Sequence, residues 1–223
     1  MFNVSRVAPA PACLAGKVYN DPSVVAILKP MFFGKCYLCE QIDLSDPEIE
    51  HFVPHEGDET LKYDWDNLFY ACGRCNSVKG SHHVNLLNCT DHNINVTLEI
   101  EHVFPGMCTE RVTIRPHSLT PSQETINTVA LLDKCYNLEN TGLRGITREN
   151  LMEKIFEYYY EYINVRRVLI TRTSLQAKVD EAIETLNLMC KNTFPFSVFW
   201  IWHFKLDTRL HELRPEVLDL INV

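Results

Sequence analysis

Four cysteines of the sequence occur as two pairs whose spacing is typical of metal binding. Cys36 and Cys39 enclose Tyr-Leu, and Cys72 and Cys75 enclose Gly-Arg. Each C-x2-C pair presents two thiolates from one tight turn, and two pairs complete the tetrahedral shell of a structural Zn²⁺. A thioredoxin-like redox centre needs only one pair and a βαβ context, so it is the weaker interpretation. The four cysteines therefore predict a zinc knuckle with an inserted segment between its halves.

The insert and the residues after it carry side chains suited to phosphodiester hydrolysis. That reaction needs a water made nucleophilic and positive charge near the phosphate. A neutral imidazole takes the proton from the water, carboxylate and amide oxygens bind Mg²⁺ or Mn²⁺, and a lysine meets phosphate as a point charge. One such residue alone is more often a surface residue, as expected for His55, His82 and His83. The candidate site residues, in chain order, are Glu50, His51, Asn67, Asn76 and Lys79.

The order and spacing of these residues resemble the HNH, or ββα-metal, nuclease motif over about residues 34–81. The stretches that carry the resemblance are IEHFVP, DNL and CGRCNSVK. It implies that His51 is the general base, that Glu50 and Asn76 hold a catalytic Mg²⁺ or Mn²⁺, and that Lys79 approaches the phosphate. It also implies that Asn67 is structural and holds the hairpin that orients the histidine. Two positions depart from the motif, with Glu50 where many relatives have Asp and Asn76 where the family name implies His.

A narrower resemblance covers IEHFVPH, YDWDNLFYACGRCNSVKG and LLDKCYNLENTGLRGITRENL. These stretches are similar to the PtuB family, the HNH subunit of Septu-type anti-phage systems that is also found beside retrons. The resemblance implies an endonuclease that cleaves DNA in anti-phage defence together with an ATPase partner of the PtuA type. RNA, including tRNA, is an alternative substrate. A different class of function is also open, namely a non-catalytic zinc-binding adaptor for protein or nucleic acid.

Composition places the chain among soluble globular proteins, with 223 residues, 46% hydrophobic and 22% charged. A net charge of −8 opposes nucleic-acid binding through Lys and Arg contacts, although bound cations and a partner protein supply positive charge locally.

The cysteine count is nine, which is odd and argues against a disulfide framework; the five unpaired ones are expected to be small buried hydrophobes. The N-terminus lacks an apolar signal core, and the apolar run Phe194–Phe204 is too short to cross a membrane. We therefore expect a cytoplasmic protein without a membrane span.

The expected fold class is α+β, with a ββα-metal module and its zinc knuckle embedded in a mainly α-helical chain. Asp21 and Pro22 predict a helix that Pro30 ends, and the stretches 95–101 and 111–115 predict an extra β-hairpin. Thr120 predicts the start of a helix through about Cys135, and Thr147 opens a second helical stretch that continues to about residue 192. The expected divisions are 1–33, 34–83, 84–118 and 119–223. Aromatic residues in the last division predict core packing and a possible homodimer interface.

Overall fold

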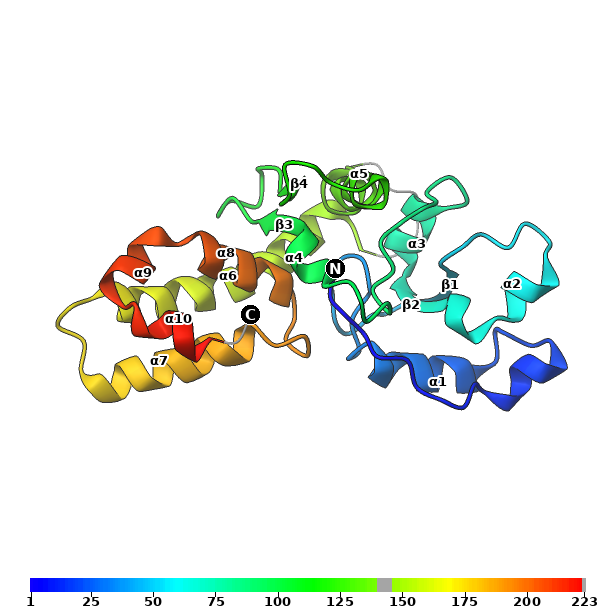
Figure 1. Ribbon diagram of the computed structural model, residues 1–223, viewed down its shortest axis with the longest axis horizontal. Coiled ribbons are helices and arrows are strands. Elements are labelled where there is room, and N and C mark those ends of the chain that lie inside the picture. The colour runs from blue at the N-terminus through cyan, green and yellow to red at the C-terminus, as the bar shows by residue number, and fades with distance from the viewer. Residues whose placement is uncertain (140–145, 222–223) are drawn as a thin grey trace.

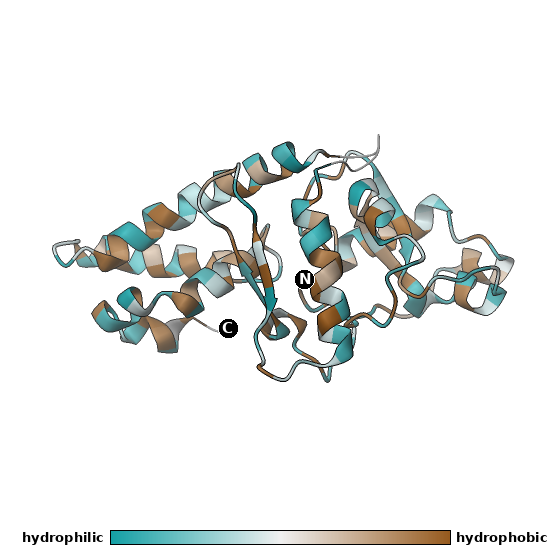
Figure 2. Cartoon of the chain, turned by 90° about the horizontal axis from the view of Figure 1, so that it is seen from above, coloured by the Kyte–Doolittle hydropathy of each residue, from teal (hydrophilic) through white to brown (hydrophobic). Residues whose placement is uncertain are grey.

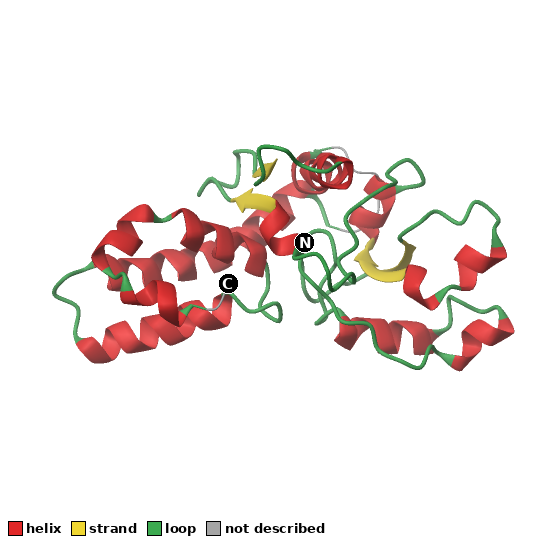
Figure 3. Cartoon of the chain, viewed as in Figure 1, coloured by secondary structure: helices red, strands yellow, loops and turns green. Residues whose placement is uncertain are grey.

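The computed structural model describes residues 1–139 and 146–221, and it consists mainly of helices with two short antiparallel sheets (Figures 1 and 3). This confirms the predicted α+β class. The elements are η1 (Ala12–Gly16), α1 (Pro22–Met31), β1 (Pro47–His51), α2 (Glu59–Tyr63), η2 (Trp65–Asn67), β2 (Leu68–Cys72), α3 (Gly73–Lys79), α4 (Val96–Glu99), β3 (Ile100–Val103), β4 (Thr113–Pro116), α5 (Gln123–Asn137), α6 (Arg148–Ile170), α7 (Gln176–Met189), α8 (Ser197–Leu206), α9 (Thr208–Leu213) and α10 (Glu216–Leu220).

The first sheet and the helix that follows it form a ββα arrangement. Strands β1 and β2 pair antiparallel, with Pro47 opposite Cys72 and His51 opposite Leu68. Every residue of β2 is buried, which explains its continuous apolar sequence. Helix α3 starts directly after β2, because the Cys72 sulfur accepts a hydrogen bond from the Cys75 amide and so caps the first turn. The second half of the knuckle is thus built into a strand-to-helix junction.

The second sheet is the predicted hairpin, but its first strand starts later than the sequence indicates. Residues Val96–Glu99, predicted as strand, form the short helix α4, and β3 begins only at Ile100. Strand β3 pairs with β4 in antiparallel register. The Thr97 carbonyl accepts a hydrogen bond from the Trp202 indole, and Val96 is buried. Tertiary packing therefore outweighs the β propensity of these four residues.

The start of one helix differs from the prediction, and the start of another is confirmed. Ser122 rather than Thr120 caps α5, and its side chain accepts a hydrogen bond from the Thr125 amide. Thr147 caps α6 as predicted. The predicted helical stretch to about residue 192 consists of α6 and α7, which residues 171–175 separate. Helix α1 contains Pro30 in its last turn and ends at Met31.

The C-terminal helices pack around an aromatic core. Helix α8, which contains most of the apolar run Phe194–Phe204, buries Trp200 and Trp202, and the Tyr162 ring of α6 stacks on Trp200. The longer helices carry hydrophobic and hydrophilic bands along their length (Figure 2), as expected for helices with one face in a core. Within residues 1–139 and 146–221, no helix combines the length and the apolar character that a membrane crossing requires.

A buried ion pair joins the first half of the knuckle to α8. The Lys35 ammonium lies 2.9 Å from Glu40 Oε2 and 3.1 Å from the Ser197 hydroxyl, and all three residues are fully buried. Burial by itself would raise the pKa of Glu40, but the charge of Lys35 lowers that pKa to about 2. Because Lys35 and Glu40 flank the Cys36–Cys39 turn, the pair fixes this turn against the helical region.

The N-terminal arm holds the segment in front of β2. The Arg6 guanidinium donates to the carbonyls of Trp65 (3.0 Å), Leu68 (2.8 Å) and Asp66 (2.7 Å). These carbonyls belong to η2 and the start of β2. The arm therefore satisfies the irregular backbone that surrounds Asn67.

The buried imidazole of His102 predicts a pH-dependent stability. Burial lowers the pKa of His102 to about 3, whereas an unfolded histidine titrates near 6.5. Below about pH 6.5 the unfolded chain binds a proton that the folded chain excludes, so this residue lowers the free energy of unfolding by about 1.4 kcal/mol per pH unit. Urea unfolding between pH 7.5 and 4.5 is therefore expected to show a difference between wild type and His102→Gln that shrinks as pH falls. The exposed His92→Gln is the control and should follow the wild-type curve; a His102→Gln curve parallel to wild type would contradict the assignment.

Candidate metal centre and adjoining histidine site

The four cysteines of the two pairs meet in the interior. Their sulfur atoms all lie within 4.8 Å of one another, and each of the four residues is buried. The sulfurs of Cys39 and Cys72 are 3.8 Å apart. A tetrahedral Zn²⁺ with Zn–S bonds of about 2.3 Å separates its sulfurs by about 3.8 Å. The cluster thus has the size and the donor chemistry to hold a zinc ion.

Thiols of the cluster change one another's pKa because they are in contact. Burial by itself would raise the pKa of Cys36, but hydrogen bonds from the thiols of Cys39, Cys72 and Cys75 lower that pKa well below its ordinary value. The hydrogen bond with Cys36 raises the pKa of Cys39, and burial adds to the rise. A thiolate at one cysteine makes the ionisation of the neighbouring thiols less favourable, because adjacent negative sulfurs repel in a dry interior. A divalent cation removes that conflict.

A fifth sulfur lies beside the cluster. A hydrogen bond with Cys135 of α5 is the largest contribution that raises the pKa of Cys75. The neighbouring Arg74 donates to the Cys135 carbonyl (3.1 Å) and to the Leu138 carbonyl (2.6 Å). These contacts clamp the start of α3 to the end of α5. Sequence reasoning treated Cys135 as a lone buried cysteine, and its distance along the chain from the two pairs gave no signal of this contact.

Asn67 holds the loop between the two strands. Its Oδ1 accepts from the Val53 amide (2.7 Å), and its Nδ2 donates to the carbonyls of Val53 and Leu61 (both 2.9 Å). The side chain is buried and uses a donor and an acceptor to satisfy irregular backbone on both sides of the insert. These contacts join the end of the insert at Asn67 to its start at Val53 and to α2.

His51 lies at the end of β1 with its ring fixed by the backbone. Its Nε2 lies 3.0 Å from the carbonyl of Lys62, and a carbonyl only accepts, so Nε2 carries the proton. The lone pair of the neutral ring therefore lies on Nδ1. Burial lowers the pKa of His51, against the opposing effect of the Lys62 carbonyl. The Tyr19 ring contacts the imidazole edge-on, with centroids 4.8 Å apart. This histidine is a neutral, oriented base near pH 7.

Glu50 lies on the buried side of β1 and is already engaged. The Tyr37 hydroxyl donates to its Oε2 (2.8 Å), and the Lys79 ammonium lies 2.5 Å from its Oε1. Only 3% of Glu50 is exposed. Burial raises the pKa of Glu50, while the charge of Lys79 opposes that rise. The carboxylate thus faces the protein interior rather than a substrate.

Asn76, expected at the catalytic ion, and Lys79, expected at the phosphate, also have partners other than those predicted. Asn76 donates through Nδ2 to Glu48 Oε2 (2.5 Å), which comes from β1. Lys79 is buried, and besides Glu50 its ammonium contacts the His51 carbonyl at 2.9 Å. This corrects the expectation that Lys79 meets a phosphate, because a side chain without exposed surface does not reach one in this conformation.

The expected Mg²⁺ or Mn²⁺ site therefore does not fit the arrangement of Glu50 and Asn76. The ammonium of Lys79 lies where a cation bound to Glu50 would lie, and Asn76 is turned toward Glu48. Glu48 and the Lys62 carbonyl were not anticipated from the sequence. Alternation along β1 places Glu48 and Glu50 on one face, which is the available signal for Glu48.

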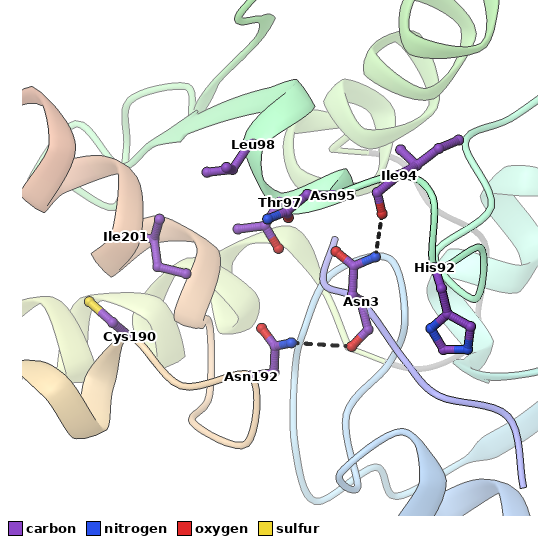
Figure 4. A pocket seen from close by; sticks show the side chains of 9 residues that line it. All are labelled: Asn3, His92, Ile94, Asn95, Thr97, Leu98, Cys190, Asn192 and Ile201. Atoms are coloured by element: carbon purple, nitrogen blue, oxygen red, sulfur yellow. Dashed lines mark hydrogen bonds between the residues drawn. The ribbon is translucent and has the colours of Figure 1, made fainter. Parts of the chain in front are cut away.

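A separate hollow of about 460 Å³ lies between the N-terminal arm, the segment around α4 and the connection from α7 to α8 (Figure 4). Its walls carry the amides of Asn3, Asn95 and Asn192 together with aliphatic side chains, and the described residues that line it include no lysine or arginine. Such a surface does not favour a phosphate backbone. The histidine site is distinct from this hollow.

The thiol cluster predicts one tightly bound zinc per chain. Cys75→Ser removes one of four sulfur ligands, so the purified variant is expected to hold well under one equivalent of zinc and to unfold at a lower temperature. Cys13→Ser changes a half-buried cysteine outside the cluster and should keep the wild-type zinc content. Elemental analysis by mass spectrometry measures both. Full zinc content in Cys75→Ser, or none in wild type, would contradict the assignment.

The pair between Lys79 and Glu50 predicts a large and non-additive effect on stability. Lys79→Met leaves a buried carboxylate without its cation, which costs about 3–5 kcal/mol, whereas the double variant Glu50→Gln/Lys79→Met recovers much of that loss. Arg111→Met breaks the exposed pair with Asp133 and should cost about 1 kcal/mol or less. Chemical denaturation of all three variants measures these differences. If Lys79→Met and Arg111→Met lowered the free energy of unfolding by the same amount, the result would argue against a buried ion pair between Lys79 and Glu50.

Comparison with known proteins finds no family model that matches the chain. The chain is 43% identical over 75 residues to the Septu protein PtuB of Bacillus mycoides strain KBAB4, a match that covers 27% of this chain and 25% of the relative. It is 37% identical over 68 residues to the Septu protein PtuB of Bacillus thuringiensis, covering 29% of this chain and 26% of the relative. The chain thus matches about a quarter of the length of these curated relatives, and the finding is a local similarity to Septu proteins PtuB.

Proposed function

We propose that the chain is an endonuclease of the HNH type that hydrolyses phosphodiester bonds of DNA. The observation that carries the proposal is the His51 imidazole, which is neutral, oriented through the Lys62 carbonyl and placed on a ββα arrangement that a thiol cluster holds together. A base with a fixed tautomer on a rigid scaffold is the part of phosphodiester hydrolysis that makes the water nucleophilic.

In the proposed reaction, Nδ1 of His51 takes a proton from a water molecule. The water oxygen attacks phosphorus, and the bond to the leaving ester oxygen breaks with its electron pair. Lys62 is the cation that we assign to the phosphate in place of Lys79, since its ammonium lies 5.8 Å from the centre of the Tyr19 ring that packs on His51. A lysine at this place supplies positive charge locally on a chain whose net charge is −8.

The roles proposed for the remaining residues are structural. Zn²⁺ on the four cysteines fixes β2 and α3, and Asn67 fixes the insert. Lys79 and Glu50 form a buried pair that supports the His51 carbonyl. No step is assigned to a divalent ion on Glu50, because the Lys79 ammonium occupies that carboxylate.

A role in anti-phage defence is part of the same proposal. The Septu names of the two relatives and the PtuB-like stretches of the sequence support it. By the same similarity we propose an ATPase partner of the PtuA type. A homodimer through the helical region is a weaker proposal, which Phe156 and Tyr160 support with exposed aromatic surface on α6.

Loss of the base is expected to abolish cleavage without loss of the fold. His51→Ala should reduce cleavage of supercoiled plasmid DNA by at least about 10²-fold, the contribution of a positioned base. Assays with Mg²⁺, with Mn²⁺ and with EDTA show whether a divalent ion takes part. Zinc content and the unfolding temperature of the variant should stay at the wild-type values, which separates loss of chemistry from loss of structure.

The alternatives correspond to other outcomes of this assay. Cleavage of RNA or tRNA but not of plasmid, still abolished by His51→Ala, would replace DNA by RNA as the substrate. A wild-type protein that cuts no nucleic acid with any of these ions, alone or with its ATPase partner, would favour the non-catalytic zinc adaptor.

A further inference from the structure

We propose that His55 is a second substrate-contacting residue, which donates a hydrogen bond from Nε2 to the phosphate that His51 serves as base. The inference rests on the proposed nuclease function and deepens it. Sequence reasoning placed His55 among surface histidines. In the structure the rings of His51 and His55 are in contact, edge to face, with centroids 4.7 Å apart.

Both neutral rings carry their proton on Nε2, but the backbone occupies opposite nitrogens of the two rings. The Gly57 amide donates to Nδ1 of His55 (3.1 Å), so the proton of the neutral ring lies on Nε2. In His51 the Lys62 carbonyl holds the proton on Nε2 and leaves Nδ1 as the acceptor. The pair therefore offers one acceptor and one donor from adjacent rings.

This combination is complementary to a hydrolysing phosphodiester. The attacking water needs an acceptor for its proton, and the phosphate oxygens need a donor as negative charge grows on them. His55 is only partly buried, so its ring remains accessible from solvent. Lys62, whose carbonyl orients His51, adds a cation nearby, since its ammonium lies 5.8 Å from the centre of the Tyr19 ring that packs on His51.

The bond to Gly57 does not by itself explain a histidine at this position. It needs only an acceptor two residues before the amide, which Asp or Asn provides in ordinary turns. Those side chains are shorter and lack a ring to pack on His51. A histidine adds a ring that contacts His51 and an Nε2–H group that the bond to Gly57 does not use.

Two variants separate the donor from the ring. His55→Phe keeps an aromatic ring against His51 and removes the N–H, whereas His55→Gln keeps an N–H donor and removes the ring. We expect His55→Phe to lower the rate of cleavage at saturating substrate by about 10²-fold, the usual effect of removing one donor to a developing charge, and His55→Gln to stay within about tenfold of wild type. The probes are supercoiled plasmid and 5′-fluorescein-labelled single-stranded DNA and RNA, each with Mg²⁺ and with Mn²⁺.

The outcomes distinguish this inference from the proposed function. Wild-type cleavage that His51→Ala abolishes and His55→Phe leaves unchanged overturns the role of His55 and retains the nuclease. The reverse ranking, with His55→Gln slower than His55→Phe, assigns ring packing rather than hydrogen bonding and also overturns it. If wild type cuts none of the probes, the proposed function fails, and anisotropy of the labelled single strands in EDTA then decides. Weaker binding by His55→Phe than by His55→Gln supports the phosphate contact, and equal binding overturns it.

Discussion

Four thiols in contact within a dry interior set the main constraint on this molecule. Neighbouring thiolates repel, so a cation at their centre stabilises the cluster, and each sulfur then fixes the backbone that carries it. Cys36 and Cys39 fix the turn that the Lys35–Glu40 pair attaches to α8. Cys72 and Cys75 fix the junction of β2 and α3, which Arg74 attaches to α5. The residues that connect the knuckle to the rest of the fold are thus direct neighbours of these four cysteines in the sequence.

The insert between the strands has a second, independent support. Residues 52–67 leave the sheet and contain only short helical turns, and the four sulfur ligands lie outside this range. Asn67 holds this loop through Val53 and Leu61, and Arg6 holds the carbonyls next to Asn67. The position of His51 depends on both supports, because its strand belongs to the sheet and the carbonyl that orients its ring belongs to the insert.

Sequence reasoning succeeded where spacing alone determines the chemistry. The two C-x2-C pairs and the cap at Thr147 follow from short-range patterns, and the structure agrees with both. It was wrong about the environment of Lys79. Helical spacing indicates which residues share one face of a helix, but not which face the rest of the protein covers. The strand predicted at Val96–Glu99 fails for a related reason, since packing against Trp202 comes from a residue far along the chain. The contacts of Glu50 with Tyr37 and of Asn76 with Glu48 required the fold itself.

The orientation of the His51 ring comes from a main-chain oxygen. Residue 62 contributes its carbonyl to the imidazole, and any amino acid that keeps the turn of α2 supplies the same oxygen. The tautomer of His51 therefore does not depend on the Lys62 side chain, whose proposed contact with the phosphate is a separate role. The orientation of this ring depends on the path of the backbone, so an insertion or deletion between β1 and α2 would disturb the tautomer of His51 more than an exchange of the Lys62 side chain.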